Sequence, residues 1–384
     1  MEQKTADTHQ IVLVLDDDLA ITEGLAAGLA RAGRTIITAN DVESGEIVVE
    51  WLKPSHVVTD VRLTGAFGYE GLDFIRFVKA HSPDSRIILM TGDAPDALQL
   101  EASERGAVGF LQKPFDVASL DSVLNLMAPH RRGSPDWPDI IRVPVLDEIL
   151  RGDTLRSIFQ PIVRIATTEQ VGYEALARCR SDSPMRNPET LFDYASRKHR
   201  VADLEVACVG NSIRSGAILA TTAALFLNIH PAVFSAGDRL YDAVISNART
   251  AGVSLNRVVL EITEQGSLTD ERGALHTIER LKTAGVRFAF DDIGVAYSHL
   301  PFIGKVRPSF LKISQHFGTG FESDSTKTKI VRNLVALAKD FDSDLILEGI
   351  ENEATANAAQ ELGIKYGQGY WFAMPAEAAT FGAS

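Results

Sequence analysis

Short apolar runs alternate with amphipathic stretches along the first third of the chain. Residues 11–15 (IVLVL) are apolar without interruption, which is typical of a strand buried on both faces of a sheet. Residues 19–32 carry apolar side chains at helical spacing, and Gly33 ends that helix. This alternation predicts an α/β, doubly wound, flavodoxin-like parallel sheet for residues 10–128. Its further strands are expected at 56–61, 86–91 and 108–113.

The alternation continues over the rest of the chain, with longer helical stretches such as 272–285 and 327–341. Each apolar run there ends in a polar residue. These residues are Glu174, Asn228, Glu261, Asp291, Lys312, Glu348 and, near the end, Gln368. Repeated strand–helix units of this kind predict a (β/α)8, TIM-like barrel over 146–384. A barrel of this type carries its site at the C-terminal ends of the strands.

A proline-rich segment separates the two patterns. Residues 129–145 contain four prolines, at 129, 135, 138 and 144. Proline at that density breaks helices and stiffens a connection. We therefore expect a linker at 129–145.

Composition restricts the partners and the setting. The 384 residues include 38 Lys and Arg against 51 Asp and Glu, a formal net charge of -13. This charge disfavours bulk electrostatic binding to DNA or to an anionic membrane surface. The longest nearly apolar stretch, 218–229, has 12 residues, whereas a membrane-spanning helix needs roughly 20. With only Cys179 and Cys208 there is no disulfide framework, so we expect a cytoplasmic protein with no DNA partner and no membrane insertion.

Acidic residues, a hydroxyl and a lysine end successive strands of the first predicted domain. They are Asp16, Asp17 and Asp18 after the first strand, Asp60, Thr91 and Lys113. The strand ends of such a sheet converge on one crevice, and clustered carboxylates favour Mg²⁺. A plainer interpretation is that the first three acids cap the following helix, and Asp18 suits that role. The full set favours a phosphoryl-transfer site with an aspartate nucleophile.

Residues 10–128 resemble the receiver domain of two-component response regulators. The resemblance rests on VLVLDDD, on VVTD at Asp60, on MTG at Thr91 and on FLQKPF at Lys113. It implies that Asp60 accepts a phosphoryl group from a cognate histidine kinase. It also implies that Asp16 and Asp17 hold one Mg²⁺ together with Asp60, and that Phe110 is the aromatic switch residue.

The polar residues at the barrel strand ends form an all-oxygen ligand set. Glu174, Asn228, Glu261, Asp291, Asp292 and Glu348 offer five carboxylates and one amide, which favours Mg²⁺ or Mn²⁺ over Zn²⁺. So many ligands would suit two ions in phosphoryl chemistry. Lys312 could orient water or stabilise charge, and Arg178 could bind a phosphate. Taken singly, each acid or amide could instead be a surface charge, a turn residue or a helix cap.

Residues 146–384 resemble the EAL-type phosphodiesterase domain of bacteria. The matching stretches are FQPIV, YEALAR, LNIHP, LEITE, DDIG, LKI, EGIEN and GQGYWF. The resemblance implies hydrolysis of cyclic di-GMP to linear pGpG, two Mg²⁺ or Mn²⁺ ions held by the six ligands above, and a homodimer or higher homo-oligomer. Lys312 matches the water-orienting lysine, and Glu264 matches the glutamate that steadies the loop after Asp292. Positions near the nucleotide are Gln160, Leu176, Arg178 and Gln368, with Glu351 a further site residue.

Two stretches depart from the family pattern. Where the family has DDFGTGYSSL, residues 291–300 read DDIGVAYSHL, with Val295, Ala296 and His299 as the main changes. Where the family has Lys-Ile-Asp, this chain has Ser314. Three functions remain open: a phosphorylation-modulated phosphodiesterase, a weak or inactive EAL domain that acts as a cyclic di-GMP receptor, and an interaction platform with neither activity.

Overall fold

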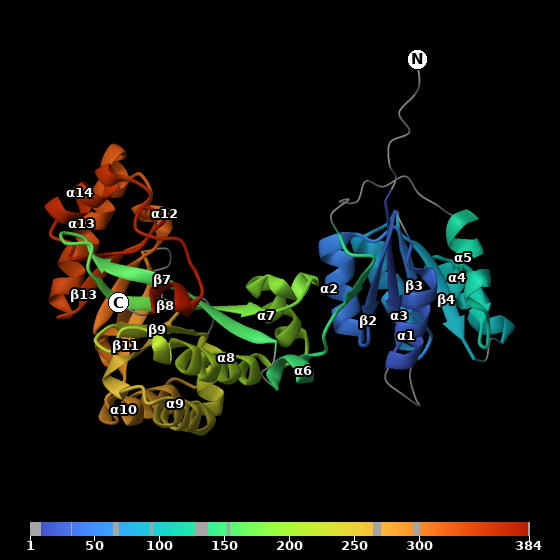
Figure 1. Cartoon of the computed structure of the whole chain (residues 1–384), viewed down its shortest axis with the longest axis horizontal. Coiled ribbons are helices and arrows are strands. Elements are labelled where there is room, and N and C mark those ends of the chain that lie inside the picture. The colour runs from blue at the N-terminus through green and yellow to red at the C-terminus, as the bar shows by residue number, and fades with distance from the viewer. Residues whose placement is uncertain are drawn as a thin grey trace, which may run out of the picture. The chain divides into compact units, whose positions relative to one another are not determined.

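The computed structural model describes residues 9–31, 33–63, 69–92, 95–126, 137–151, 154–263, 270–294 and 300–382. The chain forms two compact units (Figure 1). The N-terminal unit comprises residues 1–149 and 179–199, and the barrel unit comprises 150–178 and 200–384. None of the helices in the described ranges is both long enough and apolar enough to cross a membrane.

A six-stranded parallel sheet forms the centre of the N-terminal unit, in the order β5-β4-β3-β1-β2-β6. The strands are β1 (Gln10–Leu15), β2 (Arg34–Ala39), β3 (His56–Asp60), β4 (Arg86–Thr91), β5 (Ala107–Gln112) and β6 (Ile140–Arg142). The helices are α1 (Leu19–Leu29), α2 (Val42–Leu52), α3 (Glu70–His81), α4 (Asp96–Arg105) and α5 (Val117–Leu126). Helix α1 packs with α5, while α2, α3 and α4 pack in sequence. The doubly wound fold is confirmed.

Strand β6 comes from the segment expected to be a linker. Ile140 and Ile141 pair with Ile36 and Ile37 at the edge of β2. Ile141 and Val143 are buried, and the short helix α6 (Leu146–Leu150) follows. Part of 129–145 therefore extends the sheet, because its apolar residues cover an otherwise open edge.

Residues 179–199 lie between two elements of the barrel in sequence, yet they belong to the N-terminal unit. They form the 3₁₀ helix η1 (Pro184–Arg186) and helix α7 (Pro188–Arg197). The Asn187 side chain caps α7, and proline at the first helical position suits its missing N–H. Both η1 and α7 contact α2.

Eight strands close the barrel in the order β10-β11-β12-β13-β14-β7-β8-β9. They are β7 (Leu155–Arg164), β8 (Gln170–Cys179), β9 (Ala224–Ile229), β10 (Val258–Ile262), β11 (Arg287–Ile293), β12 (Phe310–Ile313), β13 (Asp344–Leu347) and β14 (Tyr366–Gly367). The predicted barrel is confirmed, with one difference from eight parallel strands. Strand β7 runs antiparallel to β14.

The helices of the barrel unit follow the strands. They are α8 (Val201–Ser215), α9 (Gly237–Ala251), α10 (Glu271–Thr283), α11 (Leu300–Val306), α12 (Gln315–Gly318), α13 (Ser325–Asp340), α14 (Glu353–Glu361) and α15 (Ala378–Phe381). Shorter 3₁₀ turns are η2 (Gly216–Ile218), η3 (Pro231–Ala236), η4 (Leu255–Arg257) and η5 (Phe321–Ser323). Their apolar faces and the outward faces of the strands form the larger core.

A second, smaller core consists of one residue from most strands. Its buried members are Ile162, Ala224, Phe226, Val259, Ala289 and Ile346, with Phe310 and Tyr366 packed against them. Because successive side chains of a strand alternate between faces, the residues two positions further along point to the same side as this layer. The apolar layer thus gives the site above it a fixed floor.

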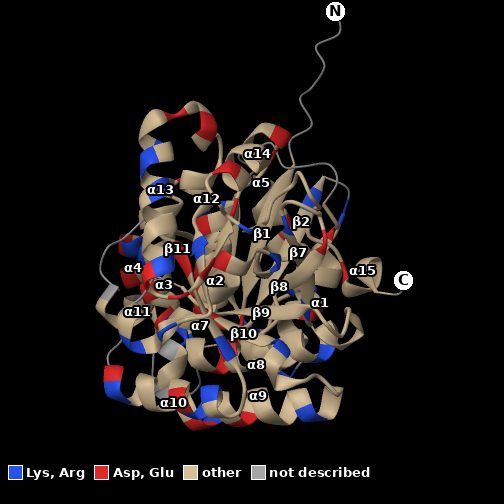
Figure 2. Ribbon diagram, turned by 90° about the vertical axis from the view of Figure 1, so that its left-hand side faces the viewer, with Lys and Arg blue, Asp and Glu red and all other residues tan. Residues whose placement is uncertain are grey.

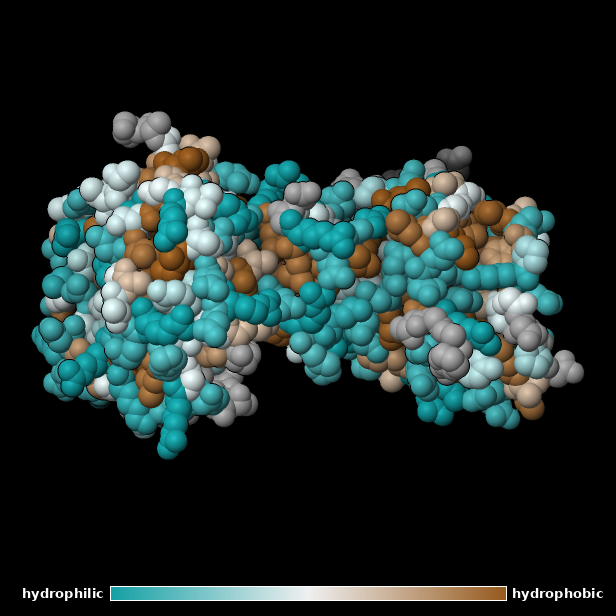
Figure 3. Space-filling view, turned by 90° about the horizontal axis from the view of Figure 1, so that it is seen from below, coloured by the Kyte–Doolittle hydropathy of each residue, from teal (hydrophilic) through white to brown (hydrophobic). Residues whose placement is uncertain are grey.

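Charged residues of both signs are interspersed on the barrel helices. Figure 2 shows acidic and basic residues alternating along α9 and α10, so these helices present no continuous basic face of the kind that binds nucleic acid. On the face drawn in Figure 3, hydrophilic residues predominate and apolar areas form small groups. The apolar side chains are concentrated in the cores of the two units.

Candidate active site

The strand ends of the N-terminal unit bring an acidic pocket and a lysine together. The Lys113 Nζ atom lies 2.7 Å from Asp16 Oδ2 and 3.3 Å from Asp60 Oδ1. Carboxylate oxygens of Asp16, Asp17 and Asp60 all lie within 4.8 Å of one another. Thr91 is buried at the end of β4, and its carbonyl oxygen accepts a hydrogen bond from the Lys113 backbone N–H. The pocket therefore has the ligand set of a divalent cation beside an aspartate that could act as nucleophile.

Burial and neighbouring charges shift the pKa values of Asp60 and Lys113 in opposite directions. Burial raises the pKa of Asp60, and the attraction of Lys113 offsets only part of that effect. Burial alone would lower the pKa of Lys113, but hydrogen bonds and attraction from Asp16 and Asp60 raise it overall. Asp18 caps α1 by accepting from the Ala20 backbone N–H, as the plainer interpretation of that residue predicts. Phe110 is half-buried on β5.

The barrel site lies one layer above the apolar floor. Six of its residues follow a residue of that layer by two positions, from Phe226 to Asn228, Val259 to Glu261, Ala289 to Asp291, Phe310 to Lys312, Ile346 to Glu348 and Tyr366 to Gln368. The period of a strand therefore directs all of them to the barrel interior. On the reversed strand β7, Gln160 precedes Ile162 by the same interval.

Lys312 stands at the centre of this layer. Its Nζ atom lies 2.7 Å from Glu348 Oε1 and 3.1 Å from both Glu174 Oε2 and Glu261 Oε1. Asp291 Oδ1 is 3.6 Å away. The lysine side chain is fully buried. Burial alone would lower the pKa of Lys312, but the surrounding carboxylates raise it well above its ordinary value, so the group is an ammonium that only donates hydrogen bonds.

The carboxylates carry more negative charge than one ammonium can balance. Burial raises the pKa of Glu261 well above its usual range, and the neighbouring acids add to that shift while Lys312 opposes it. Burial likewise raises the pKa of Glu348 to about 8. Glu174 behaves differently: burial would raise its pKa, but Lys312, Asn228 and Gln368 together hold it below the ordinary value.

A bulge in β11 directs two consecutive acids to the same place. The pairing of β11 with β12 shifts register between Phe290 and Ile293, and Asp292 adopts a positive φ of 55°. In a regular strand Asp291 and Asp292 would face opposite sides. The bulge instead leaves oxygens of Asp291, Asp292 and Glu348 within 4.8 Å of one another.

Amide side chains hold Glu174 in place. Gln368 Nε2 donates to Glu174 Oε2 at 2.7 Å and to Gln160 Oε1 at 3.0 Å. Asn228 Nδ2 donates to Glu174 Oε1 at 2.7 Å. Glu174 thus has a fixed orientation before any ligand arrives.

A cavity of about 340 Å³ opens above these residues. Of the residues predicted from sequence, its lining contains Gln160, Glu174, Leu176, Asp291, Asp292, Glu348, Glu351 and Gln368. It also contains Gln315, Gly349, Gly369 and Tyr370, which the sequence analysis did not single out. The signal was present, because Gly369 and Tyr370 lie within the GQGYWF stretch and Gln315 follows Ser314 directly.

Arg178 shares a strand face with Glu174 and Leu176 but is not among the described residues that line the cavity. Its Nη1 atom donates to the Ala177 carbonyl oxygen. Burial lowers the pKa of Arg178, with Glu174 acting in the opposite direction.

Of the two stretches that depart from the family pattern, the structure describes Ser314 but not residues 295–299. Val295, Ala296 and His299 lie outside the described residues, as does Glu264. Ser314 is buried and caps α12 by accepting from the His316 backbone N–H at 3.4 Å. At this position, therefore, a helix cap replaces a carboxylate next to Lys312.

The donor set fits divalent cations. Five carboxylates and one ammonium surround the site, and the fully buried Glu261 Oε1 has an ion pair with Lys312 but no hydrogen bond. Gln368 Oε1 is also buried, without a hydrogen-bond partner among the described residues. Hard oxygen donors with excess negative charge favour Mg²⁺ or Mn²⁺.

Comparison with known proteins agrees with this architecture. The family model of the EAL domain matches residues 145–375, and that of the response regulator receiver domain matches residues 12–125. The chain belongs to the EAL domain family and joins an EAL domain to an N-terminal receiver domain.

Individual relatives share this organisation or the barrel. The chain is 25% identical to the cyclic di-GMP phosphodiesterase RocR of Pseudomonas aeruginosa over 382 residues, which is 95% of each protein. The cyclic di-GMP phosphodiesterase TpdA of Vibrio parahaemolyticus is 25% identical over 56% of this chain, and the match spans only 36% of that longer protein. Among solved structures, the PaMucR phosphodiesterase in complex with c-di-GMP matches with a TM-score of 0.53 and 25% identity, covering 59% of this chain and 99% of that one.

Proposed function

We propose that this protein is a response regulator that hydrolyses cyclic di-GMP to linear pGpG, with turnover modulated by phosphorylation of Asp60. The observation that carries the proposal is the group of four carboxylates around Lys312, three of which, Glu174, Asp291 and Glu348, line the cavity. The similarity to RocR over nearly the whole chain supports the combination of the two domains.

Glu174, Asn228, Glu261, Asp291, Asp292 and Glu348 would hold two divalent cations. When bound, the cations would supply Lewis acidity toward a water molecule and the scissile phosphate. Lys312, whose pKa the surrounding carboxylates raise, would act as a donor to that water or to a phosphate oxygen. Gln160, Leu176, Gln368 and Glu351 line the cavity where the nucleotide would lie, and Arg178 would contact a phosphate after turning away from Ala177.

Turnover is tested directly with purified protein, cyclic di-GMP and Mg²⁺ or Mn²⁺, following pGpG by chromatography. Lys312→Ala should lower the rate by on the order of a hundredfold or more, because one charge-stabilising donor is lost. Glu174→Ala should abolish turnover through loss of a metal ligand. Lys305→Ala, at an exposed lysine of the same barrel, is the matched control. Full activity in Glu174→Ala would contradict the metal-dependent mechanism.

Regulation is tested in the same assay with an acyl-phosphate mimic. Beryllofluoride with Mg²⁺ should change the hydrolysis rate of the wild type and leave Asp60→Asn unchanged, because that variant lacks the acceptor carboxylate. Asp116→Asn, at an exposed acid of the same unit, should respond like the wild type. An identical response in Asp60→Asn would remove Asp60 from the proposal.

Ser314 favours a second candidate function. It supplies a hydroxyl where the family pattern has an acid, so the site would bind cyclic di-GMP without useful turnover. Binding measured in Ca²⁺ without pGpG formation in Mg²⁺ or Mn²⁺ would select this receptor function. Ser314→Asp keeps a good helix cap and should then restore product formation.

A further inference from the structure

The junction between β2 and α2 is bonded to the acidic pocket. Asn40 Nδ2 donates to the Asp16 carbonyl oxygen at 2.8 Å and to Thr22 Oγ1 at 3.1 Å. Asp16 is also the acid closest to Lys113. A hydrogen bond therefore links the pocket residue Asp16 to Asn40, which directly precedes Asp41, the N-cap of α2.

The next residue, Asp41, binds two helices with one carboxylate. Its Oδ1 atom accepts from the Ser44 backbone N–H at 2.9 Å and caps α2. Its Oδ2 atom accepts from the Tyr194 hydroxyl at 2.7 Å and pairs with Lys198 Nζ at 3.1 Å. Tyr194 is fully buried, and its hydroxyl oxygen accepts from the Leu146 backbone N–H. The start of α2 and the end of α7 are thus fixed to one side chain.

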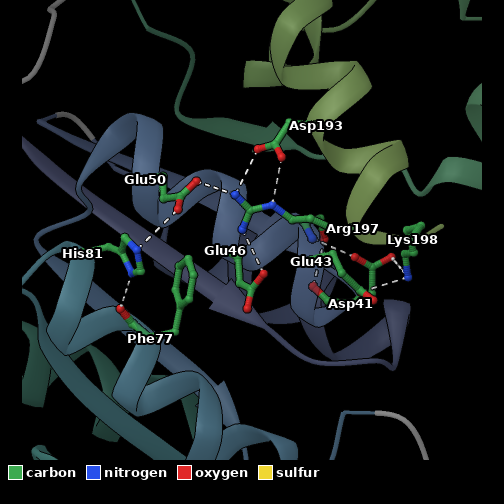
Figure 4. A network of polar contacts seen from close by, with 10 residues as sticks. Asp41, Glu43, Glu46, Glu50, Phe77, His81, Asp193, Arg197 and Lys198 are labelled. Carbon is green, nitrogen blue, oxygen red and sulfur yellow. Dashed lines mark hydrogen bonds and ion pairs between the residues drawn. The ribbon is translucent and has the colours of Figure 1, made fainter. Parts of the chain in front are cut away.

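The rest of α2 continues the contact through an acidic stripe (Figure 4), formed by Glu43, Glu46 and Glu50. Lys198 Nζ lies 3.0 Å from Glu43 Oε2. The Arg197 guanidinium reaches Glu46 at 2.9 Å and Glu50 at 2.5 Å. These side chains are 20% to 31% exposed, so solvent screens them less than fully exposed pairs.

Helix α7 is attached on both sides to elements of the barrel. Strand β8, which carries Glu174 and Arg178, ends at Cys179, and α8 starts at Val201. Between β8 and α7, Ser183 caps η1 and Met185 is fully buried. A short, folded connection, residues 180–187, therefore joins α7 to the strand that bears a predicted metal ligand.

We propose that Asp41 is the positioning residue that couples the acidic pocket to helix α7, so that α2 and α7 move as one body and β8 carries the movement to Glu174. This inference rests on the proposed function in that it takes Asp60 as the phosphoacceptor. The helix that would transmit the change is α7. It lies within the residues matched by the EAL family model, but it packs in the N-terminal unit. The α2–α7 contact is the physical link, and coupling between two sites requires such a shared element.

Hydrogen exchange of the full chain, read by mass spectrometry, tests the inference without a need for turnover. Beryllofluoride with Mg²⁺ should change amide exchange in the pocket and, in the wild type, also along α7. Asp41→Asn keeps the cap of α2 but removes the carboxylate from Tyr194 and Lys198. In this variant the backbone amides of α7 should exchange about tenfold faster, because the lost ion pair is intermediate in burial and hence in energy between exposed and buried pairs. Their exchange should also no longer respond to beryllofluoride.

Charge reversal provides an independent arm. Arg197→Glu adds a fourth acid to Asp193, Glu46 and Glu50 and should speed amide exchange of α7. Glu50→Arg in the same chain should restore protection, because opposite charges meet again. Glu101→Gln, which removes an ion pair with Arg105 within α4 of the same unit, is the control and should leave α7 unchanged.

The outcomes separate this inference from the proposed function. If α7 exchanges at the wild-type rate in folded Asp41→Asn, or if it ignores beryllofluoride in the wild type while the pocket responds, the coupling inference is overturned even when cyclic di-GMP is hydrolysed. If α7 responds as expected but no pGpG forms, the coupling stands and the enzymatic function fails.

Discussion

At the scale of single residues, Lys312 offsets charge that would otherwise disfavour the folded barrel. Four carboxylates lie within 3.6 Å of its ammonium group, and burial keeps the pKa of Glu261 and Glu348 raised despite that contact. Divalent cations would remove this imbalance and release protons, since their ligands must be ionised. Metal affinity should therefore rise with pH through the range in which Glu348 titrates, near its pKa of about 8.

A second buried acid lies outside the metal ligands. Glu205 on α8 accepts a hydrogen bond from the His230 backbone N–H, and burial raises its pKa to about 8. The unfolded chain loses this proton near pH 4.5, whereas the folded chain keeps it until about pH 8. Stability from this group is therefore complete below pH 4.5 and is lost as pH rises toward 8.

Glu205→Gln should remove that loss while keeping an acceptor for His230. We expect the variant to melt at a higher temperature than the wild type at pH 8, by roughly 5 to 10 °C, with little difference at pH 4.5. Thermal unfolding followed by circular dichroism between pH 4.5 and 9 measures the difference. Glu361→Gln, on the exposed side of α14, is the control. A constant difference across this range would show that Glu205 is ionised in the folded protein.

At the scale of elements, the spacing of strands explains which site residues could be predicted. In most of these strands the polar residue that ends the apolar run also follows a floor residue by two positions, so the strand period brings Glu261 and Lys312 together. The pattern could not predict that Asp291 and Asp292 both reach one site, because that depends on the bulge in β11. Nor could it predict the position of Arg178, whose side-chain rotamer depends on local contacts.

Helix α12 lies directly against the backbone that follows β13. A substitution on α12 can therefore test whether the position of Glu348 matters for activity. A Cβ atom on Gly318 would lie 1.9 Å from the Glu348 carbonyl oxygen. Gly318→Ala should therefore displace Glu348 and, at about 1 Å of misplacement, lower phosphodiesterase activity on the order of a hundredfold. Chromatography of pGpG together with a melting curve separates this from unfolding.

The matched control is Gly304→Ala on α11, where the nearest atom to an added Cβ is 3.7 Å away on Phe341. This substitution should leave activity unchanged. Equal activities in the two alanine variants would show that the backbone at Glu348 moves without affecting the site.

At the scale of the whole molecule, the two fold classes followed from the hydrophobic pattern, but the division between the units did not. Four prolines marked 129–145 as a linker, and nothing local in IIR at 140–142 indicates pairing with a strand a hundred residues earlier. Such an assignment depends on the open edge of β2, which is a property of the folded sheet. Similarly, α7 has an ordinary amphipathic sequence, and its contacts with α2 and with Leu146 place it in the N-terminal unit.

The role of β6 can be tested with fragments of the N-terminal unit. A fragment of residues 9–149 should melt at least about 5 °C higher than residues 9–126, because Ile141 of β6 and the following Val143 are buried beside β2. Ile141→Asp in the longer fragment should abolish the gain. Identical melting temperatures of the two fragments would show that β6 adds no stability to the sheet.

The position of residues 179–199 also bears on how such proteins can be recombined. A chimera cut in the proline-rich segment would combine this barrel with a foreign receiver and still carry α7, with Arg197 and Lys198 at its end. Without an acidic stripe opposite them, Arg197 would keep only Asp193 of its own helix, Lys198 would lose its pairs with Asp41 and Glu43, and Tyr194 would lose its acceptor. The exchangeable module is therefore not the receiver alone but the receiver together with a helix encoded some sixty residues later, and grafts that move both should keep their regulation.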